Sequence, residues 1–338
     1  MQGIYREIQK EYDESRRHAL DEIEEKKQQL YLKNSELKNL DDQINKIGVD
    51  MTKSIIFIED NKKRQEKIDL LKQKIEELKQ KRNKELEKMG IDDSYFTPNF
   101  SCKLCEDTGT IGSLEGAKMC SCFRQKVINH TYNKSQIYNI EKENFETFDE
   151  NIFSDIVNKE KYKSDKSPRE NIIYIKNKAK EFVKNFENKE TKNLLFVGGT
   201  GLGKTFLSNA IAKELIEKGK TVLYQTAGNL MDLAMDYRMN RDNNQIDESQ
   251  YRELFEVDLL IIDDLGTENV TDARRSELFN LLNTRILNGS KKNIKTLIST
   301  NKELKDLVNY YDQRIVSRLI GNFDVYRFFG EDLRLQRK

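Results

Sequence analysis

Tryptophan is absent from the 338 residues, and only two prolines, two histidines and four cysteines occur. No run of about 18 apolar residues is present, which excludes an ordinary membrane-spanning helix. The first residues, MQGIYREIQKEYDESRR, are charged from the start and lack the apolar core of a secretory signal peptide. These absences predict a soluble, cytoplasmic protein.

Positive and negative charges are nearly balanced, with 59 Lys and Arg residues against 58 Asp and Glu residues. A net charge of +1 excludes a global field that attracts DNA or a membrane, so any nucleic-acid contact requires a local patch. Charged residues make up 35% and hydrophobic residues 36%, whereas globular domains average about 25% and about 45–50%. Part of the chain is therefore expected to lack a thick core.

The segment 1–95 contains no proline, and its apolar residues recur at helical spacing. They are Leu37, Leu40, Ile44, Ile47, Met51 and Ile58, followed by Ile68, Leu71, Ile75 and Leu78, with charged and polar residues between them. This narrow stripe predicts a coiled coil, formed as a helical hairpin or with a partner. A single solvated helix is the alternative. Gly48 is a candidate for the bend of a hairpin.

Both prolines, Pro98 and Pro168, lie at predicted boundaries, because proline restrains the preceding residue away from the helical conformation. We expect four parts: a helical coiled-coil segment (1–95), a zinc-binding module (96–135), a linker (136–170) and a larger α/β domain (171–338).

The last part alternates amphipathic helices with short apolar strands. The strands are expected within 193–199, 221–227, 258–266 and 294–301, and helices are expected at 171–186 and 206–219. This alternation predicts an α/β fold with a parallel sheet that is covered on both faces.

The strongest chemical signal is GGTGLGKT, which fits the phosphate-binding pattern G-x-x-x-x-G-K-[ST]. Its residues are Gly198, Gly199, Thr200, Gly201, Leu202, Gly203, Lys204 and Thr205. The motif lies between a predicted strand and a predicted helix, where backbone N–H groups and the helix N-terminus attract phosphate. That position favours nucleotide binding over a glycine-rich turn that only mimics the pattern. We expect Lys204 to reach the β- and γ-phosphates and Thr205 to bind Mg²⁺.

A second motif, LLIIDDLG, ends a predicted strand with two carboxylates. Asp263 is expected to hold the water shell of Mg²⁺. Asp264 takes a place that often carries a glutamate, which activates the attacking water, and its shorter side chain predicts slow ATP hydrolysis. Asn301, at the end of the strand LISTN, is placed to orient the water beside the γ-phosphate.

Two arginines in QRIVSRL, Arg314 and Arg318, lie four residues apart on one helix face. An arginine supplied by a neighbouring subunit can stabilise the charge that develops on a transferred phosphoryl group. Ordinary surface ion pairs are the alternative, and the spacing leaves both interpretations open.

Together, these motifs in this order resemble the AAA+ ATPases of the bacterial replicative helicase loaders of the DnaC/DnaI type. The resemblance covers about residues 140–338 and includes the lead-in NFETFDENIF. It implies a five-stranded AAA+ core that self-associates with ATP and Mg²⁺ between subunits. It also implies that Arg318, with Arg314 beside it, acts in trans, and that Arg334 in GEDLRL senses the γ-phosphate in cis. The IstB transposition helpers share this core.

All the cysteines lie in one stretch, as C-x2-C followed by C-x-C: Cys102, Cys105, Cys120 and Cys122. Four thiolates suffice for a closed tetrahedral Zn²⁺ site, and the metal would supply the folding energy that so short a polar segment lacks. A redox pair, clustered thiols without metal and an iron–sulfur cluster are the alternatives. His130 is a further candidate ligand in place of one cysteine.

In the resembling loaders, an amino-terminal zinc-binding domain grips the hexameric replicative helicase (DnaB type), and the ATPase governs its delivery onto single-stranded DNA. A direct DNA contact is a further hypothesis, placed on Tyr237, Arg238 and Arg241, which combine stacking with positive charge. A solvated helix end explains those residues equally well. The alternative functions are a transposition helper ATPase and a non-hydrolysing adaptor locked by nucleotide.

Overall fold

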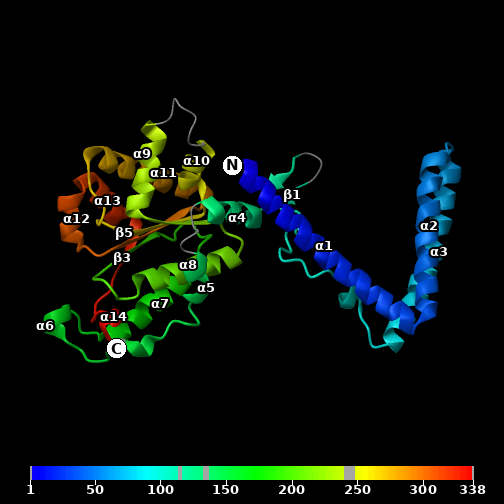
Figure 1. The fold of residues 1–338 in the computed structure, drawn as a ribbon, viewed down its shortest axis with the longest axis horizontal. Helices are drawn as coiled ribbons and strands as arrows, with labels where there is room; N and C mark the ends of the chain where they lie inside the picture. Colours follow the sequence, from blue (N-terminus) through cyan, green and yellow to red (C-terminus); the bar gives the residue numbers. More distant parts are fainter. Residues whose placement is uncertain (1, 113–115, 132–136, 240–247, 337–338) are drawn as a thin grey trace. The chain divides into compact units, whose positions relative to one another are not determined.

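The chain divides into two compact units, Gln9–Gly109 and Met1–Ile8 with Thr110–Lys338. The computed structural model describes residues 2–112, 116–131, 137–239 and 248–336 (Figure 1). Among these residues, no helix is both long enough and apolar enough to cross a membrane.

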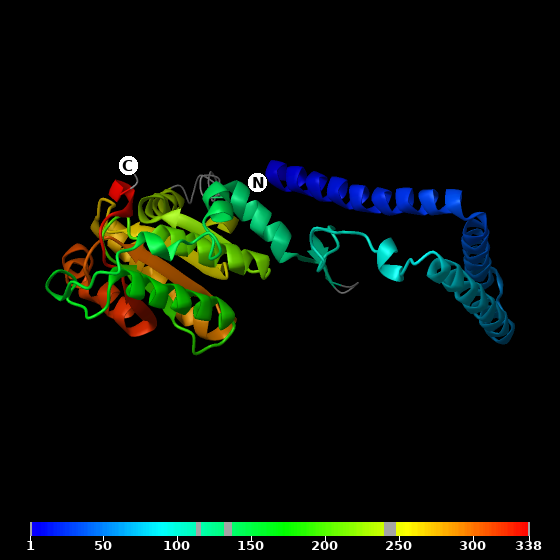
Figure 2. The same ribbon diagram turned by 90° about the horizontal axis from the view of Figure 1, so that it is seen from below.

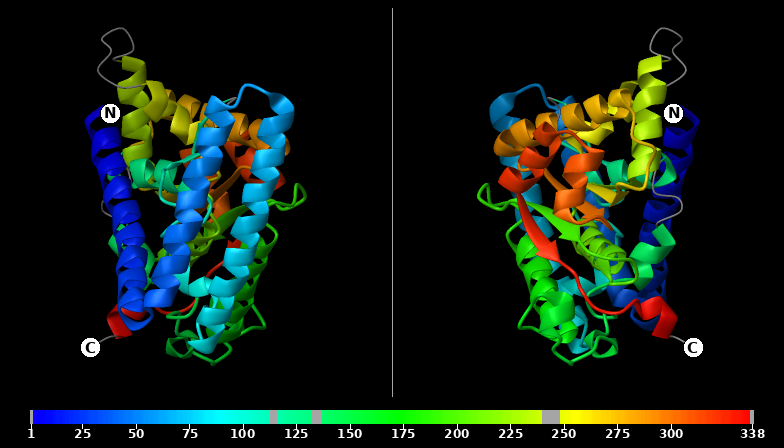
Figure 3. Two further views of the ribbon diagram at one scale, coloured as in Figure 1. Left: turned by 90° about the vertical axis from the view of Figure 1, so that its right-hand side faces the viewer. Right: turned by 90° about the vertical axis from the view of Figure 1, so that its left-hand side faces the viewer.

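Long helices dominate the amino-terminal part: α1 (Gln2–Lys33), α2 (Ser35–Phe57) and α3 (Asn61–Lys88), followed by the short η1 (Asp93–Phe96). Helices α2 and α3 pack side by side as an antiparallel hairpin (Figure 3). The predicted stripe faces inward, with Leu37, Leu40 and Leu71 buried. The other stripe residues, Ile44, Ile47, Met51, Ile58, Ile68, Ile75 and Leu78, are half-buried. This burial favours paired helices over a single solvated helix.

The bend of the hairpin lies at residues 58–60, and the prediction that Gly48 forms it is wrong. Gly48 lies inside α2, where its carbonyl accepts a hydrogen bond from the Thr52 hydroxyl. At the actual bend, Ile58 is extended and the Asp60 carboxylate caps α3 by accepting from the Lys63 N–H. A single glycine costs a helix only about 1 kcal/mol, so packing on both sides outweighs it.

The carboxy-terminal part contains a five-stranded sheet of β3 (Asn193–Val197), β4 (Val222–Thr226), β5 (Leu259–Leu265), β6 (Lys295–Thr300) and β7 (Phe323–Arg327). The strand order is β4-β5-β6-β3-β7, and all neighbours are parallel. The predicted α/β class with a parallel sheet is confirmed. Strand β7 was not predicted, because Asp324 and Arg327 interrupt its apolar pattern on the exposed edge of the sheet.

Helices cover both faces of this sheet, as predicted (Figures 1 and 2). One face carries α7 (Pro168–Lys184) and α8 (Lys204–Glu217). The other face carries α9 (Ala227–Met239), α10 (Glu248–Glu256), α11 (Asp272–Lys292), α12 (Leu304–Tyr310) and α13 (Gln313–Asn322). Helix α7 begins at Pro168, with a capping box between Ser167 and Glu170 that satisfies the first backbone donors.

Smaller elements complete the chain. The cysteine segment forms a two-stranded antiparallel hairpin, β1 (Thr110–Ile111) with β2 (Lys118–Met119), and continues into α4 (Ser121–Thr131). The segment before the sheet holds α5 (Ile137–Lys142), η2 (Glu150–Ile152) and α6 (Lys159–Tyr162), and α14 (Leu333–Gln336) follows the last strand.

Candidate nucleotide and metal sites

The predicted phosphate loop forms a tight turn between β3 and α8. Gly198 and Gly201 have φ values of +150° and +68°, which side-chain-bearing residues rarely adopt. A Cβ on Gly198 would lie 2.3 Å from the Phe328 carbonyl oxygen, and one on Gly201 would lie 1.7 Å from the Asp332 carboxylate. Gly198 is therefore required for conformation and for space, whereas Gly201 is required for its backbone conformation, because the Asp332 side chain can move aside.

Lys204 is buried at the start of α8. Its Nζ donates to the carbonyl oxygens of Gly198 (2.7 Å) and Gly199 (2.6 Å) and to Asn301 Oδ1 (2.7 Å). Burial lowers the pKa of Lys204 to about 8, and the charges of Asp264 and Asp263 oppose that shift. The ammonium group is thus aimed at oxygen acceptors inside the loop, where phosphate oxygens are expected.

Asp263 and Thr205 lie together at the carboxyl end of β5. The Thr205 hydroxyl donates to Asp263 Oδ2 at 3.2 Å, and the buried Tyr224 hydroxyl donates to the same oxygen at 2.5 Å. The Ser299 hydroxyl and the Asp264 N–H donate to Asp263 Oδ1. A hydroxyl and a carboxylate at this separation are suitable oxygen groups for Mg²⁺ with its water shell, which fits the predicted metal residues.

Asp264 and Asn301 form the next layer of the site. Asp264 adopts a left-handed φ of +56° at an irregularity of the β5–β6 register between Ile262 and Leu265. Asn301 Nδ2 donates to Asp264 Oδ1 at 3.0 Å. Burial first, and then the charge of Asp263, raise the pKa of the Asp264 carboxyl. Asn301 thereby links Lys204 to Asp264 beside the cavity.

A cavity of about 280 Å³ opens over the phosphate loop. Asp264, Asn301 and Arg334 line it, so the structure brings these three predicted residues to one place. The lead-in also lines it, through Thr147, Phe148, Asp149, Ile152 and Phe153, as does the preceding Glu143. No role was predicted for the residues of this lead-in, although its repeated phenylalanines were an available signal in the sequence.

Arg314 and Arg318 belong to α13 and are not among the described residues that line this cavity. Arg314 pairs with Asp312 at 2.6 Å, and its guanidinium lies 5.0 Å from the centre of the Phe279 ring. Arg318 Nε donates to Asn283 Oδ1 at 3.2 Å. Their trans-acting role stays a prediction.

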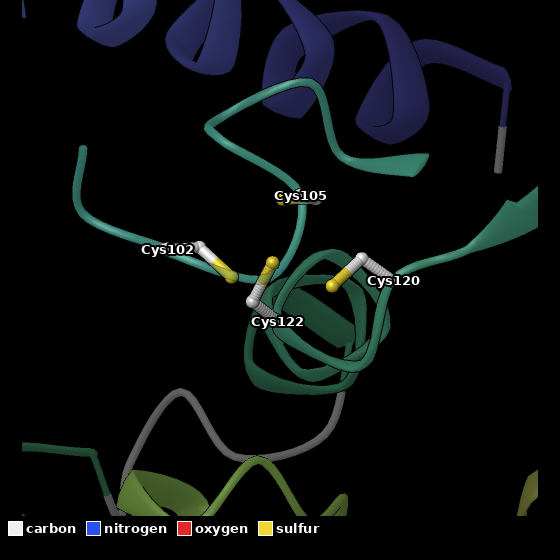
Figure 4. A group of neighbouring side chains, drawn as sticks. All are labelled: Cys102, Cys105, Cys120 and Cys122. Atoms are coloured by element: carbon white, nitrogen blue, oxygen red, sulfur yellow. The ribbon is translucent and has the colours of Figure 1, made fainter. Parts of the chain in front are cut away.

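The four cysteine side chains gather around one point, two from the turn 102–105 and two at the start of α4 (Figure 4). Their sulfur atoms all lie within 4.8 Å of one another. The buried Asp107 carboxylate accepts from the N–H groups of Ser101 (2.9 Å) and Cys102 (2.8 Å), which fixes the first turn. Four thiolates at this spacing fit a tetrahedral ion with Zn–S bonds of about 2.3 Å. His130, in the last turn of α4, is not part of this group.

Two of the three residues of the DNA-contact hypothesis have partners within the fold. The Tyr237 ring stacks on Tyr251 at 4.2 Å, and Arg238 Nε lies 2.6 Å from the buried carboxylate of Glu277. Arg241 lies outside the described residues. A DNA contact therefore stays a prediction, and the observed contacts give two of these residues a structural task.

Comparison with known proteins finds similarity to one protein family and to several curated proteins. Residues 177–338 match the family model described as IstB-like ATP binding protein. The replicative helicase loader DnaC of Escherichia coli (strain K12) is 28% identical over 158 residues, which cover 44% of this chain and 62% of that protein. DnaC of Buchnera aphidicola subsp. Baizongia pistaciae is 31% identical over 145 residues, or 43% of this chain and 56% of that protein. The predicted resemblance to the DnaC helicase loaders and to the IstB-like family is confirmed.

The match spans less than two thirds of the length of either relative. Among solved structures, the crystal structure of the DnaC helicase loader aligns with a TM-score of 0.44 at 22% identity, covering 56% of this chain and 98% of the other.

Proposed function

We propose that this protein is an ATP-dependent loader that delivers a hexameric replicative DNA helicase onto single-stranded DNA during initiation or restart of replication. The observation that carries the proposal is the convergence of Lys204, Thr205, Asp263 and Asn301 at one end of a parallel sheet, in a domain similar to the DnaC loaders.

ATP is held by the phosphate loop, with Lys204 on its phosphates and Thr205 and Asp263 on the side of the metal. Bound Mg²⁺ would neutralise charge on the phosphates. Asp264 and Asn301 orient the attacking water, and Arg334 contacts the nucleotide from the same chain. Hydrolysis is slow, since an aspartate replaces the longer glutamate, and it responds to the partner or to DNA.

The cysteine segment and the helical hairpin bind the helicase. The four clustered thiols hold a structural zinc ion, which stabilises a polar segment with little core of its own. A closed site of this kind leaves no open coordination position for chemistry, so its purpose is recognition. Binding and hydrolysis of ATP then switch between retention and release of the helicase.

The match to the IstB-like family model supports a second candidate, a transposition helper ATPase. Such a protein would bind duplex DNA and a transposase instead of a helicase. A nucleotide-locked adaptor without hydrolysis is the third candidate, and it requires the cavity to bind ATP without turnover.

Co-purification of the full chain with a hexameric replicative helicase tests the proposal, together with ATP hydrolysis in the presence and absence of single-stranded DNA. We expect a stable complex, DNA-stimulated hydrolysis, and loss of ATP binding in Lys204→Ala. Lys213→Ala is the matched control, because that lysine lies on the same helix in an exposed pair with Glu217. Failure to bind any helicase while binding duplex DNA would favour the transposition helper, and ATP binding without hydrolysis would favour the adaptor.

A further inference from the structure

Tyr224 is a fully buried tyrosine whose hydroxyl lies on the predicted magnesium aspartate. Its side chain is 0% exposed, and its hydroxyl donates to Asp263 Oδ2 at 2.5 Å. A tyrosine hydroxyl is protonated at neutral pH, so it is the donor in this hydrogen bond and the carboxylate is the acceptor. Neither the phosphate motif nor the aspartate motif includes this residue.

Tyr224 and Thr205 donate to the same carboxylate oxygen of Asp263. Asp263 Oδ2 also accepts from Thr205, the residue expected to bind Mg²⁺ directly. Outer partners of this kind orient a carboxylate and tune its basicity, and their removal typically lowers metal affinity about 10–100-fold. Tyr224 is therefore in a position to set the orientation of Asp263.

The strand that carries Tyr224 is an edge strand, and a helix from the cysteine segment holds its outer side. Strand β4 pairs only with β5 within the described sheet. On the other side, the Val222 N–H donates to Gln125 Oε1 at 2.6 Å, and Gln125 Nε2 donates to the Val222 carbonyl at 3.0 Å. The amide of Gln125 thus replaces a neighbouring strand two residues before Tyr224.

Helix α4 has a second attachment to the same domain. Arg124 Nε and Nη2 bind the Glu253 carboxylate of α10 at 3.1 and 2.6 Å. Gln125 is only 5% exposed, which shields its two hydrogen bonds from water. Because Cys120 directly precedes α4 and Cys122 lies in its first turn, the helix begins within the thiol cluster.

We propose that Tyr224 is a positioning residue for Asp263, and that α4 fixes the strand that carries Tyr224. The part of the cysteine segment that holds Cys120 and Cys122 is thereby mechanically connected to the magnesium side of the nucleotide site. The inference rests on the proposed function, because it requires the site to bind Mg²⁺ with nucleotide. Detachment of α4 from β4 loosens Asp263 and weakens Mg²⁺ binding.

Magnesium titration of the full chain with a fluorescent ATP analogue tests the role of Tyr224. We expect Tyr224→Phe to bind Mg²⁺ roughly tenfold more weakly, with unchanged affinity for the analogue in the presence of EDTA. Tyr326→Phe is the matched control, since Tyr326 is a half-buried tyrosine on β7, at the opposite edge of the sheet. Equal Mg²⁺ affinity of Tyr224→Phe and the wild type would overturn the positioning role.

Gln125→Leu tests the role of α4, because leucine has a similar volume but cannot bond to Val222. We expect faster hydrogen exchange of the Val222 amide and a weakening of Mg²⁺ affinity that is smaller than for Tyr224→Phe. Faster exchange of the Val222 amide with unchanged Mg²⁺ affinity would contradict the proposed connection between α4 and the magnesium site.

A label in the wild-type chain covers the case in which Tyr224→Phe does not fold. With ¹³Cζ-tyrosine, the Tyr224 resonance is expected to shift when Mg²⁺ is added to the nucleotide-bound protein, whereas that of Tyr326 stays. No shift at Tyr224 would count against the proposal. A wild-type protein that binds no Mg²⁺ and no nucleotide would instead contradict the proposed function.

Discussion

At the scale of single residues, Lys204 combines burial with a positive charge. Its ammonium group donates to two carbonyls of its own loop and to Asn301, none of which carries a formal charge. The lowered pKa, about 8, means that roughly half of these side chains are neutral at pH 8. The tetraanionic triphosphate is a much stronger partner for the charged form than the loop carbonyls are.

We predict that ATP binding above pH 8 takes up a proton at Lys204. The pKa is depressed before binding, and phosphate raises it, so affinity falls by up to about tenfold per pH unit above pH 8. Calorimetry at pH 8.5 in two buffers of different ionisation enthalpy measures this uptake. Lys213→Ala should keep it, and identical heats in both buffers would show that Lys204 stays charged throughout.

Site residues that belong to local motifs were predictable from the sequence. A site residue that reaches the site only through the pairing of two strands was not. Lys204, Thr205, Asp263 and Asn301 each follow or end a strand within a recognisable pattern, and the structure brings them together. Tyr224 is different, because its hydroxyl reaches Asp263 only when β4 lies beside β5. No spacing along the chain encodes that pairing.

At the scale of elements, apolar periodicity located the buried helices and strands, but edges and bends depended on weaker signals. Strand β7 was missed because an edge strand alternates exposed polar residues with few apolar ones. The hairpin bend was misplaced because glycine is a weak helix breaker, whereas Asp60 is a strong cap. The cysteine pattern, in contrast, needed only spacing to predict the observed cluster.

We predict that the cysteine segment releases about one zinc ion per chain on denaturation, as a four-thiolate site requires. Chelation under native conditions should loosen the start of α4 and speed amide exchange there, because the metal supplies the folding energy of this segment. A metal-sensitive dye and hydrogen exchange measure both effects. A Cys105→Ser protein that still carries stoichiometric zinc would contradict the assignment, and His130→Ala should retain the ion.

At the scale of the whole molecule, α13 presents two arginines that do not line the chain's own cavity, as far as its described residues show. Among the described residues Arg318 has no carboxylate partner: it donates to the neutral Asn283 amide at 3.2 Å, and its guanidinium lies 5.9 Å from the centre of the Phe279 ring. An arginine in that situation is suited to a phosphate that another copy of the chain carries.

We predict that Arg318→Ala and Lys204→Ala are each inactive as ATPases but restore activity when mixed. In a head-to-tail assembly, random mixing places an intact Lys204 against an intact Arg318 at about a quarter of the sites. Steady-state hydrolysis of the mixture, compared with each variant alone, measures the effect. Complete inactivity of the mixture under conditions where the variants co-assemble would place Arg318 outside the catalytic interface.

The hydrogen bonds between Gln125 and Val222 also protect the edge of the sheet against aggregation. An edge strand with unsatisfied N–H and C=O groups is a template for intermolecular pairing and fibre growth. At Val222 the edge is covered by α4, which forms hydrogen bonds to its backbone through Gln125. The first turn of α4 carries Cys122, one of the four clustered thiols, which can be oxidised. Oxidation of the thiols that detaches α4 from β4 would therefore expose this edge of the sheet and promote aggregation.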